Sequence, residues 1–306
     1  MAQPILLSKV YIIAGPTASG KSAYAIDLAR QLGGEVVNAD SAQMYTRVSI
    51  GTAKPLDWAT HEIKHHLFDI CDQPVDFDVT QYRERILAVV ADINARGKVP
   101  ILVGGSLFYI KSLFFPPHQA HGRSDNAASS VPESVRLLSS AEQWSHLREV
   151  DPARAAQVHM HDTYRVMRAL ALWYENGVKP SLLVPTYKPP FLANIVFLSP
   201  PSDVLYDRIN QRTEQMVYRD GWIEEVRGLM GDAAWRHLVE TKGFIGYREL
   251  AAWIEAGGAA DQLPIVVAYI QQETRNYAKR QRTFWRSFVR QLEEVGGCEI
   301  KEIDSA

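Results

Sequence analysis

The chain has few features of several common protein classes. Its 306 residues include only two cysteines, Cys71 and Cys298, which are too few and too far apart for a disulfide framework or a cysteine metal site. We therefore expect reduced thiols and a cytoplasmic protein. The formal net charge is -2 at pH 7. The chain as a whole has no basic excess for binding nucleic acid, so any basic surface must be local.

Long hydrophobic runs are also missing. No stretch of about 18 or more apolar residues occurs, so the sequence predicts no membrane span. The start, "MAQPILLSKVYIIAG", is apolar but lacks a charged first region and a small-residue cleavage site, and it continues into a glycine loop. We expect a buried first strand rather than a signal peptide. Nothing in the sequence requires a second copy of the chain, so we expect a monomer.

What the sequence does contain is an alternation of apolar strands and helical segments. Four stretches predict strands, at 10–14, 35–40, 99–105 and 194–200. Helical periodicity covers 21–32 and 82–96. Strands that alternate with helices favour an α/β fold in which helices cover a parallel sheet.

This alternation is interrupted between the third and fourth strands. Residues 115–134 are rich in Pro, Ser, Ala and His and read as a mobile connection. Residues 135–176 are helical in pattern, with Asp151 as a helix N-cap and Pro152 at the first helical position. We therefore predict a core formed by residues 1–115 and 191–306, and a mainly helical insertion domain at 116–190.

A phosphate-binding loop follows the first strand. Residues 15–22, "GPTASGKS", match G-x-x-x-x-G-K-[ST] in the strand–loop–helix context that the motif requires, so the core is of P-loop type. Its amides and the helix N-terminus attract an oxyanion. Lys21 adds a positive charge, and Ser22 can ligate Mg²⁺. The residues expected to bind phosphate or diphosphate are Gly15, Pro16, Thr17, Ala18, Ser19, Gly20, Lys21 and Ser22.

An acidic residue and a pair of arginines are candidates for the same site. Asp40 in "NADSAQMY" follows the second strand, at the sheet edge where α/β folds bind ligands. The third and fourth strands end in "LVGG" and "LSP", so Asp40 is the only acid so placed. It could cap a turn, support Mg²⁺ or act as a general base. Arg208 and Arg212 share a helix face, either as solvated charges or as lid arginines that neutralise leaving charge.

The C-terminal part predicts a long helix over Ile270–Arg290 with a basic stripe. Residues 275, 279, 282, 286 and 290 are all Lys or Arg and fall on one side. Residues 270, 277, 284 and 288 are apolar or aromatic and fall on the other, where we expect packing on the core. The stripe suits a phosphate backbone, although a solvated polar face would look the same.

A literal H-E-x-x-H occurs at His61–His65. As a zinc protease signature it needs a long helix and a third ligand. Pro55 and the following "HHLFDICDQP" leave room only for a short helix. We do not predict zinc there, and the sequence assigns this segment no role.

The motifs together resemble the tRNA dimethylallyltransferase family. Its order and spacing are matched from about residue 10 to 285 by "GPTASGKS", "DSAQMY", "IGTAKP", "HHLFDI", "LVGGSLFYIKSL", "DPARAAQVHMHDTYRVMRAL", "RINQRTEQM" and "GFIGYRE". The resemblance implies transfer of a dimethylallyl group from dimethylallyl diphosphate to N6 of the adenosine at tRNA position 37, beside the anticodon. The loop would hold the prenyl diphosphate rather than ATP, with Mg²⁺ on Ser22, and the acceptor would be a tRNA anticodon stem-loop.

The resemblance also implies residue roles. Asp40 matches the general base and Arg212 the diphosphate-binding arginine, and Lys21 completes the catalytic set. Ser106 stands where the family usually has threonine, and His161, Tyr164 and Ala171 also depart from its pattern. Residues expected to contact tRNA, from the family motifs and the basic stripe, are Asp40, Ser41, Ala42, Gln43, Ser106, Tyr164, Arg165, Arg168, Gly243, Phe244, Ile245, Gly246, Tyr247, Arg248, Lys279, Arg282 and Arg286.

Three other functions share part of this pattern. A prenyltransferase acting on free AMP or ATP would have a similar loop but no need of the insertion and the basic helix. An ATP-dependent nucleotide kinase would use the loop and the lid arginines but gives no role to "DSAQMY" and "GTAKP". A non-catalytic RNA-binding protein would not need Asp40 and the complete loop.

Overall fold

The structure, a computed structural model, describes residues 9–117, 130–183 and 185–304. The chain divides into two compact units, Met1–Phe114 with Pro189–Ala306, and Phe115–Lys188. Most of the connection predicted at 115–134 lies outside the described residues, as do the first eight residues. None of the described helices combines the length and the apolar composition needed to cross a membrane.

The first unit is built on a six-stranded sheet with the order β3-β2-β4-β1-β5-β6, in which all neighbouring strands are parallel. Its strands are β1 (Lys9–Ala14), β2 (Gly34–Asn38), β3 (His65–His66), β4 (Val99–Gly104), β5 (Leu192–Leu198) and β6 (Cys298–Ile303). The predicted α/β fold with a parallel sheet is confirmed. The four predicted strands correspond to β1, β2, β4 and β5. The sequence did not indicate β3 and β6, which lie at the two edges of the sheet.

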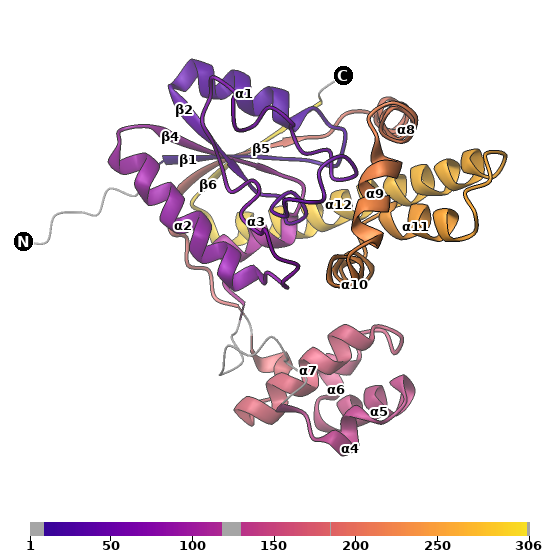
Figure 1. The fold of residues 1–306 in the computed structure, drawn as a ribbon. Helices are drawn as coiled ribbons and strands as arrows, with labels where there is room; N and C mark the ends of the chain where they lie inside the picture. Colours follow the sequence, from indigo (N-terminus) through magenta and orange to yellow (C-terminus); the bar gives the residue numbers. More distant parts are fainter. Residues whose placement is uncertain (1–8, 118–129, 184, 305–306) are drawn as a thin grey trace, which may run out of the picture. The chain divides into compact units, whose positions relative to one another are not determined.

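Helices cover both faces of this sheet (Figure 1). One face carries α1 (Lys21–Leu32); the other carries α2 (Val79–Ala95), α3 (Leu107–Phe114) and the C-terminal half of α12 (Leu263–Val295). Under α1 the core is aliphatic and includes Ile13, Val36 and Ile101. Under α12 it is aromatic, and the ring of Trp285 stacks on Phe197 with centroids 4.3 Å apart. Since both faces are buried, the central strands are continuous apolar runs.

Four further helices gather with the N-terminal half of α12 beyond the carboxyl edge of the sheet (Figure 1). They are α8 (Ser202–Tyr218), α9 (Trp222–Met230), α10 (Ala233–Lys242) and α11 (Tyr247–Glu255). The predicted helix at 270–290 is therefore the central part of a helix of 33 residues. This helix connects the sheet to the α8–α11 group.

The second unit, Phe115–Lys188, is mainly helical. It contains α4 (Glu133–Arg136), α5 (Ser140–Val150), α6 (Pro152–Ala155) and α7 (Thr163–Asn176), and the short 3-10 helix η2 (Pro180–Leu182). Leu147, Val166 and Leu170 form the centre of a core of its own. Asp151 caps α6 by accepting a hydrogen bond from the Arg154 amide at 3.0 Å, and Pro152 occupies the first turn, as predicted.

Candidate active site

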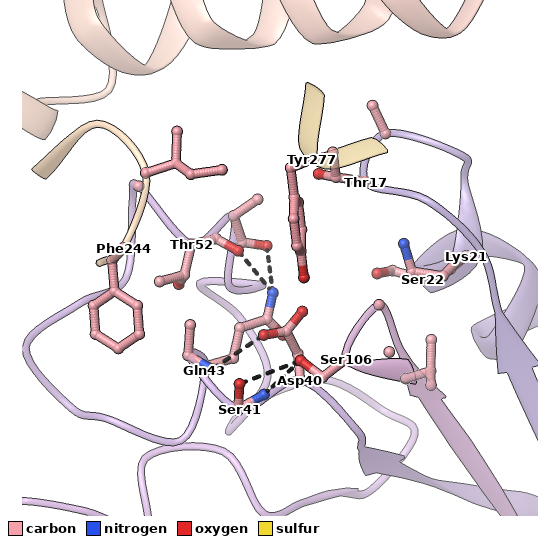
Figure 2. Close-up of a pocket in the computed structure, with 18 of the residues that line it drawn as sticks. Thr17, Lys21, Ser22, Asp40, Ser41, Gln43, Thr52, Ser106, Phe244 and Tyr277 are labelled. Carbon is pink, nitrogen blue, oxygen red and sulfur yellow. Dashed lines mark hydrogen bonds between the residues drawn. The ribbon is translucent and has the colours of Figure 1, made fainter. Parts of the chain in front are cut away.

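A cavity of about 610 Å³ lies at the carboxyl edge of the sheet. The predicted phosphate loop, Asp40, Ser106, Arg212 and the segment 243–245 all contribute to its wall. They come from distant parts of the sequence and meet because parallel strands end at one edge. Figure 2 shows the phosphate-loop residues Lys21 and Ser22 on one side and Gln43 and Thr52 on the other, with Asp40 between them.

The phosphate loop has a backbone that favours glycine at two positions. Gly20 precedes α1 with φ 85°, and this helix end has no side-chain cap. At Gly15, a Cβ atom would lie 2.6 Å from the Leu198 carbonyl oxygen. The Lys21 Nζ donates to the Pro16 carbonyl at 2.7 Å. Burial lowers the pKa of Lys21 to about 8, although Asp40 opposes this shift.

A second cation reaches the loop from α8. The guanidinium of Arg212 donates to the hydroxyl of Thr17. Burial lowers the pKa of Arg212 to about 10, again opposed by Asp40. Burial disfavours the charged forms of both Lys21 and Arg212, and an anion bound between them would favour those forms. The site is therefore suited to a ligand of high negative charge.

Asp40 is oriented by its own chain segment. Its amide donates to Asn38 Oδ1 at 2.9 Å, and its Oδ1 accepts from the Ala42 amide at 3.1 Å. Burial raises the pKa of Asp40, while the Ala42 amide and Lys21 act in the opposite direction. A carboxylate with a raised pKa binds a proton more readily. Asp40 is thus suited to accept a proton inside the cavity.

The residues after Asp40 connect to the end of β4 and to "GTAKP". The Ser41 amide donates to Ser106 Oγ at 3.1 Å, so serine at this position does supply a hydroxyl contact. Gln43 Nε2 donates to the carbonyls of Thr52 and Ala53 at 2.9 and 3.2 Å (Figure 2). The "GTAKP" segment, which would have no role in a kinase, therefore positions Gln43.

A half-buried carboxylate joins this segment to the helices beyond the sheet. Glu225 on α9 accepts hydrogen bonds from the amides of residues 49, 50 and 51 at 2.8, 2.8 and 3.3 Å. The hydroxyl of Tyr247 donates to the same carboxylate at 2.7 Å. Tyr247 is only 1% exposed. Its side chain therefore belongs to this framework and also lines the cavity, so contact of Tyr247 with tRNA stays a prediction.

Glycine lets these segments approach the ring of Trp222. A Cβ atom at Gly51 would lie 2.3 Å from the indole, and one at Gly246 would lie 2.2 Å from it. This explains why Gly246, expected to contact tRNA, is glycine. Its neighbours Gly243, Phe244 and Ile245 line the cavity, whereas Arg248 lies on the surface.

Two residues of α12 were missed as site residues by the sequence reasoning. Gln281 accepts from the Thr17 amide and donates to the Gly105 carbonyl, both at 2.9 Å, and so joins the phosphate loop to β4. Tyr277 points into the cavity (Figure 2), although the stripe pattern placed it on the core-packing face. A usable signal was present: Thr274, Tyr277 and Gln281 put polar groups at positions expected to be apolar.

The basic stripe of α12 is turned largely toward α8. Arg275 donates to Asn210 at 2.5 Å, and Arg282 donates to Ser202 Oγ at 2.8 Å. Between them, Lys279 Nζ lies 5.8 Å from the ring centroid of Tyr206. The expectation of one open ridge therefore does not hold for Arg275 and Arg282, which are bonded within the protein. Lys279 and Arg286 are exposed, and contact of Lys279, Arg282 and Arg286 with tRNA stays a prediction.

The remaining predicted positions lie elsewhere. Tyr164 is 78% exposed and Arg165 is exposed, and both lie in the first turn of α7. Arg168 is partly buried on the same helix. The H-E-x-x-H segment is not helical, and its Glu62 pairs with Arg30 at 2.6 Å. Among the described residues, no group of three His, Cys, Asp or Glu side chains could hold a metal ion.

Comparison with known proteins decides the family. The family model described as IPP transferase matches residues 43–288. This chain belongs to the IPP transferase family. A tRNA dimethylallyltransferase of Geobacter sulfurreducens is 39% identical over 282 residues, which cover 91% of this chain and 89% of that protein. One from Geobacter metallireducens is 36% identical over 282 residues, which cover 91% and 90%.

Solved structures agree with this assignment. A eukaryotic dimethylallyltransferase acting on tRNA superposes with a TM-score of 0.77 at 25% identity, over 98% of this chain and 74% of that one. A tRNA isopentenylpyrophosphate transferase from Bacillus halodurans gives 0.65 at 30% identity, over 97% and 90%. The resemblance of the motifs and the P-loop type of fold are thereby confirmed. Membership of this family disfavours the kinase and the non-catalytic RNA-binding protein.

Proposed function

We propose that this protein transfers the dimethylallyl group of dimethylallyl diphosphate to N6 of the adenosine at tRNA position 37, beside the anticodon, and releases diphosphate. One observation carries the proposal. A cationic phosphate loop and a carboxylate with a raised pKa share one cavity, in a chain whose curated relatives are tRNA dimethylallyltransferases.

The cations of the loop side bind and neutralise the leaving group. Lys21, Arg212 and the amides of residues 17–22 surround the diphosphate, and Gly15 and Pro16 hold the start of the loop. Charge builds up on the bridging oxygen as its bond to carbon breaks, and preorganised cations stabilise it there. Each such contact typically lowers the barrier by about 3 kcal/mol.

The residues of this side also fit Mg²⁺. Ser22 points into the cavity beside Lys21 (Figure 2), and its hydroxyl is a suitable ligand. Because the described residues hold no cluster of three acidic, His or Cys side chains, the ion would take its other ligands from diphosphate and water, which Mg²⁺ prefers. When bound, it neutralises diphosphate charge.

Asp40 supplies the base. The exocyclic amine of adenine is a weak nucleophile because its lone pair is delocalised into the ring. Asp40 accepts the N6 proton as the new C–N bond forms. Ser41, Gln43, Ser106 and Phe244 surround the place where the base enters (Figure 2). A base in an anticodon loop leaves its stack at a cost of a few kcal/mol, less than in a duplex.

A partner the size of an anticodon stem-loop requires contacts beyond the cavity. We assign them to the exposed residues Tyr164, Arg165, Arg248 and Arg286. Recognition of this kind relies on phosphates and unstacked bases rather than on reading a duplex. The protein acts as a monomer in the cytoplasm, where its tRNA substrate occurs.

One assay tests the proposal against its rivals. Radiolabelled dimethylallyl diphosphate is incubated with tRNA, with AMP, with ATP or with no acceptor. We expect label in tRNA alone, and none in a tRNA with guanosine in place of adenosine at position 37. Label in AMP or ATP would instead identify an adenylate prenyltransferase, and phosphate transfer from labelled ATP would identify a kinase.

A further inference from the structure

The reacting carbon has a defined place in the cavity. Its leaving group lies at Lys21 and Arg212, and its nucleophile lies at Asp40. The first carbon of the dimethylallyl group must therefore lie between these two sides. The charges that line this gap are placed to neutralise diphosphate and to accept a proton. The positive charge that develops on the allyl group would be stabilised further by an aromatic face beside it.

Tyr277 occupies this gap. In Figure 2 its side chain descends from α12 between Lys21 and Ser22 on one side and Thr52 on the other, and its hydroxyl ends near Asp40 and Ser106. The ring is seen edge-on, so its faces are turned to the two sides of the cavity. A ligand that extends from the phosphate loop to Asp40 would contact a face of this ring.

The position of the ring is held by the following turn of α12. Gln281 lies four residues further along the helix and makes two hydrogen bonds of 2.9 Å, one to the phosphate loop and one to the end of β4. Burial and the neighbouring Asp40 raise the pKa of Tyr277, so the phenol stays neutral. The side chain of Tyr277 is therefore an uncharged group in a cavity whose other walls carry the charged groups of Lys21, Arg212 and Asp40.

We propose that the ring of Tyr277 faces the allyl group of the prenyl donor and stabilises its developing positive charge. This inference rests on the function proposed above. In the step, the C1–O bond breaks and its electron pair leaves with diphosphate. The N6 lone pair forms the new bond to C1, and the N6 proton passes to Asp40. Tyr277 exchanges no atom or electron and acts through its ring quadrupole.

The expected size of the effect follows from this chemistry. A cation over a desolvated aromatic face is stabilised enough to change a rate by about 30-fold. One neighbouring cation has to be considered: Arg280 Cζ lies 5.9 Å from the ring centroid, close to the outer limit of such contacts. Tyr277 could therefore act through Arg280 instead, and the test must separate the two.

The test compares Tyr277→Phe, which keeps the ring, with Tyr277→Leu, which removes it. Tyr269→Leu is the matched control because Tyr269 lies on the same helix and is 52% exposed. Single-turnover transfer to tRNA and binding of inorganic diphosphate are measured separately. We expect Tyr277→Phe and Tyr269→Leu within about threefold of wild type, and Tyr277→Leu about 30-fold slower with unchanged diphosphate affinity.

A series with successively fluorinated phenylalanines at position 277 separates charge from shape. Fluorine withdraws electrons from the ring with little change in size, so the rate should fall steadily along the series. A flat series, a Tyr277→Phe variant as slow as Tyr277→Leu, or an Arg280→Gln variant that makes the Tyr277→Leu change silent would each overturn the proposal. If wild type fails to label tRNA at all, the proposed function fails first.

Discussion

Replacement of Asp40 by asparagine tests the central step of the reaction. Asparagine has nearly the same shape, and its oxygen can still accept from the Ala42 amide, which now bonds to Asp40 at 3.1 Å. The variant loses the base and also the negative charge that raises the pKa values of Lys21 and Arg212. General-base catalysis is worth about 10²- to 10⁴-fold, or about 3 to 5 kcal/mol of barrier. We expect Asp40→Asn to lose kcat/KM by this factor while it binds tRNA as wild type does.

The pH dependence makes the prediction sharper. The base works only when deprotonated, so kcat/KM of wild type should rise with pH through the raised pKa of Asp40. Lys21 works only when protonated, and its pKa in the free enzyme is about 8, so kcat/KM should fall again as pH rises past that value. The bound diphosphate favours the charged lysine, so the alkaline fall of kcat should lie at higher pH. Asp40→Asn should lose the acid limb, and its alkaline limb should move to lower pH because the charge of Asp40, which raises the pKa of Lys21, is gone.

The assay is single-turnover transfer of label to tRNA over the pH range that spans both groups. Asp27→Asn is the control, because Asp27 is an exposed carboxylate on α1 that pairs only with Arg30 at the surface in the contacts described. The unfolding free energies of Asp40→Asn and wild type are measured alongside this assay. A buried carboxylate with a raised pKa lowers stability once it is charged above that pKa, so Asp40→Asn should be at least as stable as wild type at pH 7. A variant with near wild-type rate, or with an unchanged acid limb, would refute the assignment of the base.

Three further predictions concern the framework of the core unit. Glu225→Ala leaves the amides of residues 49–51 without their acceptor and should cost about 3 kcal/mol in urea unfolding, with a lower kcat/KM for tRNA. The pKa of Glu35 is lowered from 4.5 to about 2, chiefly by its hydrogen bond with Arg96. The Glu35→Gln variant should therefore lose about 3 kcal/mol of unfolding free energy at pH 7. The difference from wild type is present above pH 4.5 and should disappear as the pH falls toward 2. Gly104→Ala would bring a Cβ atom to 2.0 Å from a backbone oxygen, so thermal unfolding should show a loss of about 3 kcal/mol, and full stability would contradict the close approach of β2 and β4.

Local sequence was sufficient for the central strands and the phosphate loop. Continuous apolar runs such as "VYIIA" and "PILVGG", each ended by glycine, suit strands in a sheet covered on both faces. The glycine pattern of residues 15–22 needs only its own backbone and the following helix. Strand β6, "CEIKEI", was missed because its alternating charged residues are typical of a solvated surface, and only pairing with β5 makes it a strand.

The α12 helix shows why the rest could not be predicted. Helical periodicity correctly placed residues 275, 279 and 282 on one side, but it does not say what lies opposite. The neighbour is α8, and two of these cations donate hydrogen bonds to Asn210 and Ser202 on that helix. Periodicity likewise put Tyr277 on an inward face without distinguishing a packed core from a cavity.

The sequence by itself determined the four central strands and the phosphate loop, because each is encoded within a few consecutive residues. The tertiary structure decided which groups share the cavity. Gln281 joins residues 17 and 105 by hydrogen bonds, and Glu225 joins residue 247 to the segment 49–51. The partners are more than a hundred residues apart in the sequence in every case except the contact between Glu225 and residue 247. Hydrogen bonds and desolvation depend on distance in space, so the charges and proton affinities of this site exist only once the chain has folded.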